Sequence, residues 1–259
     1  PAPPAPAPPA PAPSAHPPAP ASTTPAAPVV SEPPPSVPPQ VLHGVSLERV
    51  TGFADLPGDV QKRVCEAAEV VELGVEEETS GFAVALVLDG QAFVYAAVAD
   101  VPAEALGVAT FASMLTTRPD VPAIRVVAAA PTKVAVWQRD QLLDLLEDCP
   151  WVINEFRLAG DRHAATAGAT MGPLGDLDES SRFAILGRLA VKALKPGQTY
   201  LEQGADLPGL TIVGAGALVH QLPAGEHEFG PGDVVLAARA MEGGTLESPL
   251  VAGEGGAIL

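Results

Sequence analysis

Hydrophobic positions are unevenly spaced along this chain, and their pattern divides it into distinct kinds of segment. Residues 1–40 carry almost no apolar side chains larger than alanine or proline. After residue 41, short runs rich in β-branched residues alternate with turn sequences such as Asp89-Gly90, which is typical of strands. Other stretches repeat their apolar residues at helical spacing. We therefore expect a mainly β protein with flanking short helices.

In the first half, the pattern predicts strands at Val70–Leu73, Phe82–Leu88, Gln91–Val98, Ile124–Ala129 and Lys133–Trp137. The turn sequence Asp89-Gly90 separates the second strand from the third, so we expect these two to pair as a hairpin. Residues 42–50 fit a short strand or a short helix, and residues 105–112 fit one helical turn.

Helices are predicted after Asp55-Leu56-Pro57, at residues 140–149 with Asp140 as the N-cap, and from Trp151 to Leu158. The small residues that follow are expected to form an interdomain linker over 159–171. Another short helix opens near Asp176.

The order of elements then begins again. Strands are expected at Val191–Leu194, Thr199–Leu201, Leu210–Val213, Ala217–Val219, Val234–Leu236 and Leu250–Ala252. Asp55-Leu56 returns as Asp176-Leu177, and Val127-Ala128 returns as Val251-Ala252. We interpret the halves as tandem small jelly-roll barrels, a first domain at 42–158 and a second at 172–259. The second is expected to lack its last strand and terminal helices.

Composition sets the first 41 residues apart as a tether. Residues 1–40 hold 18 of the 30 prolines and a single charged residue, Glu32. Proline removes backbone donors, and so little apolar surface cannot offset the entropy of ordering, so we expect a disordered, extended spacer. The alternative is a proline-rich ligand for an aromatic groove. The spacer would join the rest to an upstream domain or protein partner.

Charge and cysteine usage narrow the classes of partner. The net charge is −17 with only 14 Lys and Arg, which argues against nucleic acid and against anionic membrane surfaces. The sequence has no apolar run of 18 residues and no recognisable signal peptide. Cys65 and Cys149 have neither disulfide-framework nor metal-ligand spacing, which favours a reducing, cytoplasmic location.

Several segments resemble the cyclic nucleotide-binding domain family. In the first half they are Phe53-Ala54-Asp55-Leu56, Val87-Leu88-Asp89-Gly90, and the stretches 128–136 and 142–150. In the second half they are Leu194-Lys195-Pro196-Gly197-Gln198 and the stretch 229–234. The resemblance covers about residues 45 to 158 and, more weakly, 172 to 259. It implies a regulatory, signalling domain without enzymatic activity.

The family's phosphate cassette, Gly-Glu followed by Arg-x-Ala-x-Val-x-Ala, implies where a ligand would bind. A gapless match puts Gly107 and Val108 on Gly-Glu, and Pro122 and Ala123 on the start of the second part. Both charged contacts are therefore missing, although Arg118 or Arg125 could substitute. In the second half the cassette positions are Leu236, Ala237 and Leu246, again uncharged. A phosphate buried without a counter-charge is costly, so we expect ligand binding to be lost.

Other chemical motifs carry less weight. Gly214-Ala215-Gly216 lacks the third glycine of a dinucleotide fingerprint, and Pro223 interrupts the helix that it requires. His220, His227 and Glu228 lack metal-ligand spacing, and no serine or cysteine stands in a nucleophile motif. We therefore expect no catalytic residues, no metal and no cofactor.

Three hypotheses stay open from the sequence. The first is a non-enzymatic regulatory or scaffolding module that has lost its ligand. The second is a working sensor of cAMP or cGMP with a divergent cassette. The third is an unrelated β-rich enzyme or binding domain whose site is formed by loops.

Overall fold

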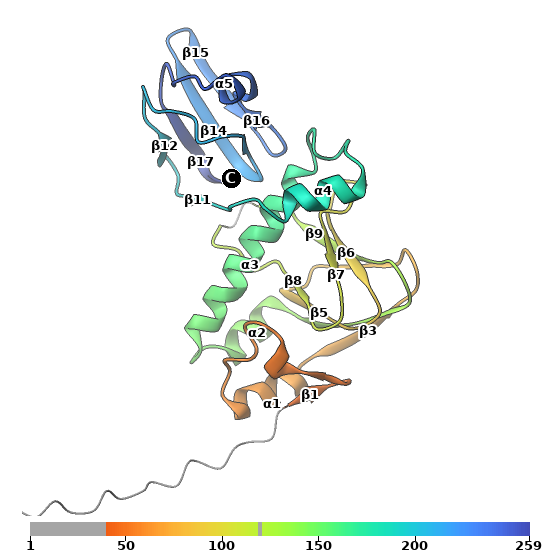
Figure 1. Ribbon diagram of the computed structural model, residues 1–259. Coiled ribbons are helices and arrows are strands. Elements are labelled where there is room, and N and C mark those ends of the chain that lie inside the picture. The colour runs from red at the N-terminus through yellow and green to blue at the C-terminus, as the bar shows by residue number, and fades with distance from the viewer. Residues whose placement is uncertain (1–39, 119–120) are drawn as a thin grey trace, which may run out of the picture. The chain divides into compact units, whose positions relative to one another are not determined.

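The structure is a computed structural model that describes residues 40–118 and 121–259 (Figure 1). Nearly all of the predicted tether, and so its expected extended state, lies outside these residues. The chain opens with two paired strands, β1 (Val41–Leu42) and β2 (Val45–Ser46), and a 3-10 helix at Leu47–Arg49. Helix α1 (Gly58–Glu66) then leads into the barrel.

The first barrel has the strand order of a jelly roll. Its strands are β3 (Glu69–Leu73), β4 (Glu78–Ser80), β5 (Val84–Asp89), β6 (Ala92–Ala96), β7 (Glu104–Leu106), β8 (Phe111–Ser113), β9 (Ile124–Ala128) and β10 (Thr132–Trp137). They form two antiparallel sheets of four strands, in the orders β3-β10-β5-β8 and β4-β9-β6-β7. Consecutive strands such as β3 and β4 therefore fall in different sheets, as in a double-sheet jelly roll. The β-rich fold class predicted from the sequence is confirmed.

The predicted hairpin at Asp89-Gly90 is wrong. Strand β5 pairs with β10 and β8, whereas β6 pairs with β9 and β7, so the turn carries the chain from one sheet to the other. Gly90 has φ +84, and a Cβ there would lie 2.4 Å from the carbonyl oxygen of Pro131. The Asp-Gly sequence marks a position that needs glycine, but burial of both strands decides their partners.

Two other local predictions are also wrong. Residues 105–112 form no helical turn, because they supply the end of β7 and the start of β8. Helix α2 (Arg139–Leu145) begins after Gln138 rather than after Asp140, and Gln138 makes no side-chain capping bond. Asp140 lies in the first turn, where its charge still complements the helix dipole.

Aromatic side chains join the barrel to the helices beside it. Phe53 packs against Trp137 and Phe156, with ring centroids 5.1 and 4.9 Å apart. All three side chains are fully buried, and the indole of Trp137 donates to the carbonyl oxygen of Val64 at 2.9 Å. This cluster fixes α1 and the following helices on one side of the β5-containing sheet.

Helix α3 (Pro150–Ala169) runs 20 residues and corrects the predicted linker, because residues 159–169 are its C-terminal half. That half is largely buried. A Cβ on Gly160 would lie 1.6 Å from the carbonyl oxygen of Leu115, and one on Gly168 would lie 1.6 Å from that of Gly214. The small residues that suggest a loop are instead the ones that let a helix approach backbone closely.

The C-terminal lobe follows helix α4 (Glu179–Leu186), whose N-cap Asp178 accepts a hydrogen bond from the amide of Ser181. Its elements are β11 (Ala193–Leu194), β12 (Thr199–Leu201), β13 (Thr211–Ile212), β14 (Ala215–Leu222), β15 (Gly225–Phe229), β16 (Val234–Val235), α5 (Ala237–Glu242) and β17 (Leu250–Ile258). The sequence did not predict β15 or α5.

Strand β17 pairs with three other strands of this lobe. Its first part pairs with β12 and β14, and its last residues pair with β11 and the start of β14. Strand β14 continues to β15, while β13 pairs with β16. The first barrel differs in one pair, because its third strand β5 pairs with the last strand β10, whereas β13 pairs with β16 and not with β17. The final residues Ala257 and Ile258 are thus paired, in contrast to the expected missing last strand. That the lobes are two copies of one domain stays a prediction.

The close approach of α3 gives a test of the fold. Replacing Gly160 with alanine should lower the free energy of unfolding by about 2 kcal/mol, because overpacking against Leu115 outweighs the gain in helix propensity. Gly107→Ala is the matched control, since no atom lies within 4 Å of its Cβ. Urea denaturation of both variants measures this, and equal stabilities would show that α3 does not pack as described.

Candidate functional site

The first-half cassette positions fall in two separate places. Gly107 and Val108 lie in the exposed turn between β7 and β8, where the side chain of Val108 is 51 % exposed. The hydroxyl of Thr110 donates to the carbonyl oxygen of Gly107 at 2.7 Å, which closes the turn. Pro122 and Ala123 lie just before β9, at the other end of the β8–β9 connection.

The space beside Pro122 is nearly filled. The cavity that Pro122 shares with Ser113, Met114 and Ile124 also has Gly160 and Ala164 of α3 in its wall. Its volume is about 10 Å³, roughly the space of one water molecule. A nucleotide needs a cavity of several hundred Å³, so this position holds no ready pocket.

Helix α3 is joined by directed hydrogen bonds to the end of β8 and to the connection that follows it. At the end of β8, the hydroxyl of Ser113 donates to the carbonyl oxygen of Phe156 at 2.8 Å, and the amide of Ser113 donates to Nδ1 of His163 at 3.2 Å. Farther along, the amide and hydroxyl of Thr117 donate to the two carboxylate oxygens of Asp161, at 2.9 and 2.6 Å. We call these four bonds the α3 latch.

The latch presents the wrong charge to a phosphate. Asp161 is 3 % exposed, and the described residues contain no cationic side chain paired with it. The only guanidinium in the connection belongs to Arg118, whose Nη1 is buried and has no hydrogen-bond partner among the described residues. Arg125, the other candidate substitute, pairs with Glu78 and donates to the carbonyl oxygen of Ala99.

The second-half cassette positions lie within or beside an apolar core. Leu246 is 2 % exposed and packs in the same cluster as Leu236, which precedes α5 with a left-handed φ of +46. Ala237 is the first residue of α5. The structure therefore brings Leu236 and Leu246 together as packing residues, with no charged side chain of the motif among them.

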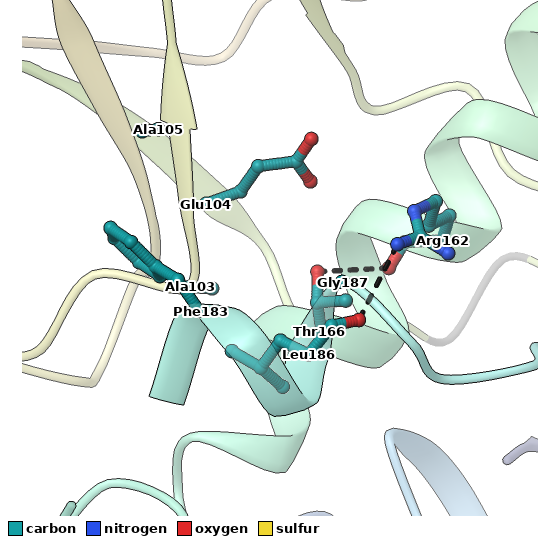
Figure 2. Close-up of a pocket in the computed structure, with 8 residues that line it drawn as sticks. All are labelled: Ala103, Glu104, Ala105, Arg162, Thr166, Phe183, Leu186 and Gly187. Atoms are coloured by element: carbon teal, nitrogen blue, oxygen red, sulfur yellow. Dashed lines mark hydrogen bonds between the residues drawn. The ribbon is translucent and has the colours of Figure 1, made fainter. Parts of the chain in front are cut away.

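A second hollow lies between β7, α3 and α4 (Figure 2). Its volume is about 170 Å³. Glu104 projects into it from β7, facing Arg162 across the space, and Phe183 and Leu186 form its apolar side. The guanidinium of Arg162 donates to the carbonyl oxygens of Leu186 and Leu189, so it ties α3 to the end of α4.

His163 connects this hollow with the latch. Its Nδ1 accepts from Ser113, so the neutral ring carries its proton on Nε2, which lies 3.8 Å from a carboxylate oxygen of Glu104. Burial lowers the pKa of His163, which outweighs the opposing effect of Glu104. The ring is therefore held neutral as an acceptor for backbone.

Sequence reasoning missed the contacts of Asp161, His163 and Glu104. The partners are separated by 44 and 50 residues in the two latch contacts, and two of the three lie in the segment that composition assigned to a linker. A helical reading of residues 150–169 would have placed Asp161 and His163 on its buried side.

The weaker motifs form no site in the described part of the chain. Residues 40–118 and 121–259 contain no group of three or more His, Cys, Asp and Glu side chains able to hold a metal. His220, which is buried, shares a hydrogen bond of 3.1 Å with the hydroxyl of Ser248. Burial raises the pKa of the thiols of Cys65 and Cys149, which are free. No described helix is both long and apolar enough to cross a membrane.

Comparisons with known proteins give structural likeness only. No protein-family model matches this sequence, and no curated protein matches it. Among solved structures, the chain is similar to the regulatory domain of protein kinase A from Toxoplasma gondii in complex with cAMP, at 15 % identity and a TM-score of 0.35. That match covers 82 % of this chain and 84 % of the other.

Two further structures are similar. The regulatory subunit of a cAMP-independent protein kinase A from Trypanosoma cruzi, bound to guanosine, matches at 18 % identity and a TM-score of 0.33, over 82 % of this chain and 76 % of the other. The sensor domain of the transcriptional regulator DNR from Pseudomonas aeruginosa matches at 13 % identity and a TM-score of 0.37, over 42 % and 79 %. These values describe likeness of fold and assign no ligand.

The resemblance predicted from the sequence is thus to the same kind of domain that the structural comparison finds. The fold itself rests on the strand order of the first barrel, which is that of a jelly roll. The likeness is one of fold alone, and a cyclic nucleotide-binding-like domain over residues 42–158 stays a prediction.

Proposed function

We propose that this chain is a non-enzymatic regulatory or scaffolding module in which helix α3 has taken the place of a nucleotide ligand. The observation that carries the proposal is the α3 latch. The end of β8 is bound by His163 and the carbonyl oxygen of Phe156, and the β8–β9 connection, where the cassette would hold a phosphate, is bound by Asp161.

Charge and space both support loss of the ligand. The latch places a buried carboxylate on the connection, and an anion beside it would be repelled at short range in a medium of low dielectric. The cavity of about 10 Å³ leaves no room for a sugar or a base. Binding would therefore require α3 to move away and four hydrogen bonds to break.

Mechanically, α3 joins the barrel to the C-terminal lobe. Its middle is bonded to the β8–β9 connection, while Ala165 packs with Ala215 and Ile258 of the lobe. Such a module would pass a change in the position of α3 on to its partner, instead of responding to a bound small molecule. Partner proteins, or a domain joined through residues 1–41, would be its targets.

The second candidate is a working cyclic nucleotide sensor with a divergent cassette. One observation favours it, namely the buried Nη1 of Arg118 without a partner among the described residues. The guanidinium lies against the backbone of Gly256 in the C-terminal lobe, so it could bind a phosphate at this connection only after leaving that position.

Nucleotide titration separates the two candidates. Calorimetry with cAMP and with cGMP should show no binding up to about 1 mM, because α3 fills the site, and the melting temperature should stay unchanged. Low-micromolar binding would contradict the proposal. If such binding appeared and were abolished by Arg118→Gln but not by Arg157→Gln, an exposed arginine on α3, the sensor would be correct.

The latch itself can be tested through Asp161. Asp161→Asn keeps an acceptor for the amide of Thr117, but the Thr117 hydroxyl loses its charged acceptor and can only accept from the new amide group, so the change should cost about 1–2 kcal/mol of unfolding free energy. Hydrogen exchange at the Thr117 amide should also become faster. Asp176→Asn, an exposed carboxylate, is the control. Unchanged exchange at Thr117 in Asp161→Asn would show that the latch does not hold the connection.

His163 gives the fold a specific pH dependence. Its pKa is lower in the folded state than the value of about 6.5 expected after unfolding, so the unfolded state binds the proton first on acidification. The stabilising contribution should be complete above pH 6.5 and be lost as pH falls from there toward the folded-state pKa. The slope approaches about 1.4 kcal/mol per pH unit.

The matched variant is His163→Asn, whose side-chain oxygen can still accept from Ser113. It is less stable at neutral pH because it leaves a cavity, but its unfolding free energy should fall less between pH 6.5 and 5. Urea denaturation across this range compares the two proteins. Parallel pH profiles would exclude His163 as the titrating group.

A further inference from the structure

We propose that the C-terminal lobe and the end of α3 form a binding site for a small apolar carboxylate. The cavity has a volume of about 320 Å³ and lies apart from the latch. It is bounded by the end of α3, by the segment after α4 and by residues of β12 and β13. This inference does not depend on the proposed function of the barrel.

The wall of the cavity is mainly apolar. Ala165 and Ala169 of α3 form one side, and Val191, Leu210 and Ile212 lie around them. Leu210 is 61 % exposed, so it leaves apolar surface available at the opening. A volume of this size is at the lower end of the range for small-molecule pockets and fits a ligand of about ten non-hydrogen atoms.

The charges at the cavity are positive, in contrast to the protein as a whole, which has a net charge of −17. Its charged side chains are Arg188 and Lys192, and no Asp or Glu side chain is part of the lining. Within the described residues neither cation is in an ion pair, and Lys192 instead lies over the ring of Tyr200 at 4.9 Å. Leu259, the last residue of the sequence, also lines the cavity, and no ion pair joins its carboxylate to either cation. An anionic ligand at the opening would therefore meet two exposed cations that have no ion-pair partner among the described residues.

Neighbouring elements hold the backbone of Arg188 and Lys192 in place. Arg162 donates to the carbonyl oxygens of Leu186 and Leu189 on both sides of Arg188. Lys192 exchanges two backbone hydrogen bonds with Leu259, at 2.9 and 3.0 Å. Two cations on such fixed backbone lose less conformational freedom on binding than cations on a mobile loop.

A hydroxyl donor completes the polar set. The hydroxyls of Tyr200 and Thr211 share one hydrogen bond of 3.1 Å. Each hydroxyl carries one proton, so one O–H remains unpaired after that bond forms. Both residues line the cavity. The free O–H can donate to an anionic oxygen that also faces Lys192.

These features together favour a carboxylate with an apolar body. Phosphates are bound by several backbone amides or by a buried arginine fork, and the lining shows neither. A neutral apolar ligand would leave both cations unused, and an amine would be repelled by them. A medium-chain carboxylate places its chain along the α3 alanines and its head between Lys192 and the hydroxyl pair.

The experiment titrates the chain with octanoate, and with octanamide as a neutral ligand of the same shape, by calorimetry and ligand-observed NMR. Octanoate should bind with a dissociation constant of about 0.1–1 mM, and octanamide at least tenfold more weakly. Lys192→Gln and Arg188→Gln should each weaken octanoate binding about tenfold. Lys195→Gln, an exposed lysine outside this cavity, is the matched control.

Three results would overturn the proposal. They are no octanoate binding by the folded chain at 10 mM, equal affinity for octanoate and octanamide, or equal weakening by Lys195→Gln and Lys192→Gln. Circular dichroism of each variant shows whether it is folded. Because cyclic nucleotides are titrated separately against the barrel, failure here leaves the α3 latch untouched, and failure of the latch leaves this site untouched.

Discussion

Helix α3 lies so close to backbone on two sides that only glycine fits at the points of contact. Gly160 meets the carbonyl group of Leu115 in the barrel, and Gly168 meets that of Gly214 in the C-terminal lobe. A β-carbon at either position would overlap an oxygen atom. The latch bonds depend on this approach, because His163 reaches the end of β8, and Asp161 the connection after it, only when the helix backbone lies close to them.

A single rigid helix with two such contacts couples the structures at its ends. Between Gly160 and Gly168 the chain makes two turns, so a shift at one contact cannot be absorbed before the other. Packed interfaces of this kind change between discrete arrangements rather than deforming gradually. The same helix also lines the 320 Å³ cavity with Ala165 and Ala169, which places that cavity next to the moving part of any such change.

The sequence predicted most strands of the first barrel correctly because their burial leaves a strong local pattern. Strand β5 is a continuous buried run, and β6 alternates between buried and half-buried residues. Pairing partners leave no such local pattern. Asp89-Gly90 is a good hairpin sequence, yet the strands on either side belong to different sheets because each has a longer buried face to satisfy elsewhere. A turn sequence therefore predicts the turn itself, but it does not predict which sheet the strands on either side will join.

The candidate site was hidden by the same small residues that build it. Gly160, Ala164 and Gly168 look like linker composition, whereas in the fold they remove side-chain bulk from a helix that must touch backbone. A cassette can fail by losing its charged residues, which a motif comparison detects at Val108 and Pro122. It can also fail because another part of the chain binds its backbone, which no local motif reports. Under the proposed function, the hydrogen bonds of Asp161 and His163 would exclude a ligand whether or not the cassette positions carried charge, because the cavity beside Pro122 has a volume of only about 10 Å³.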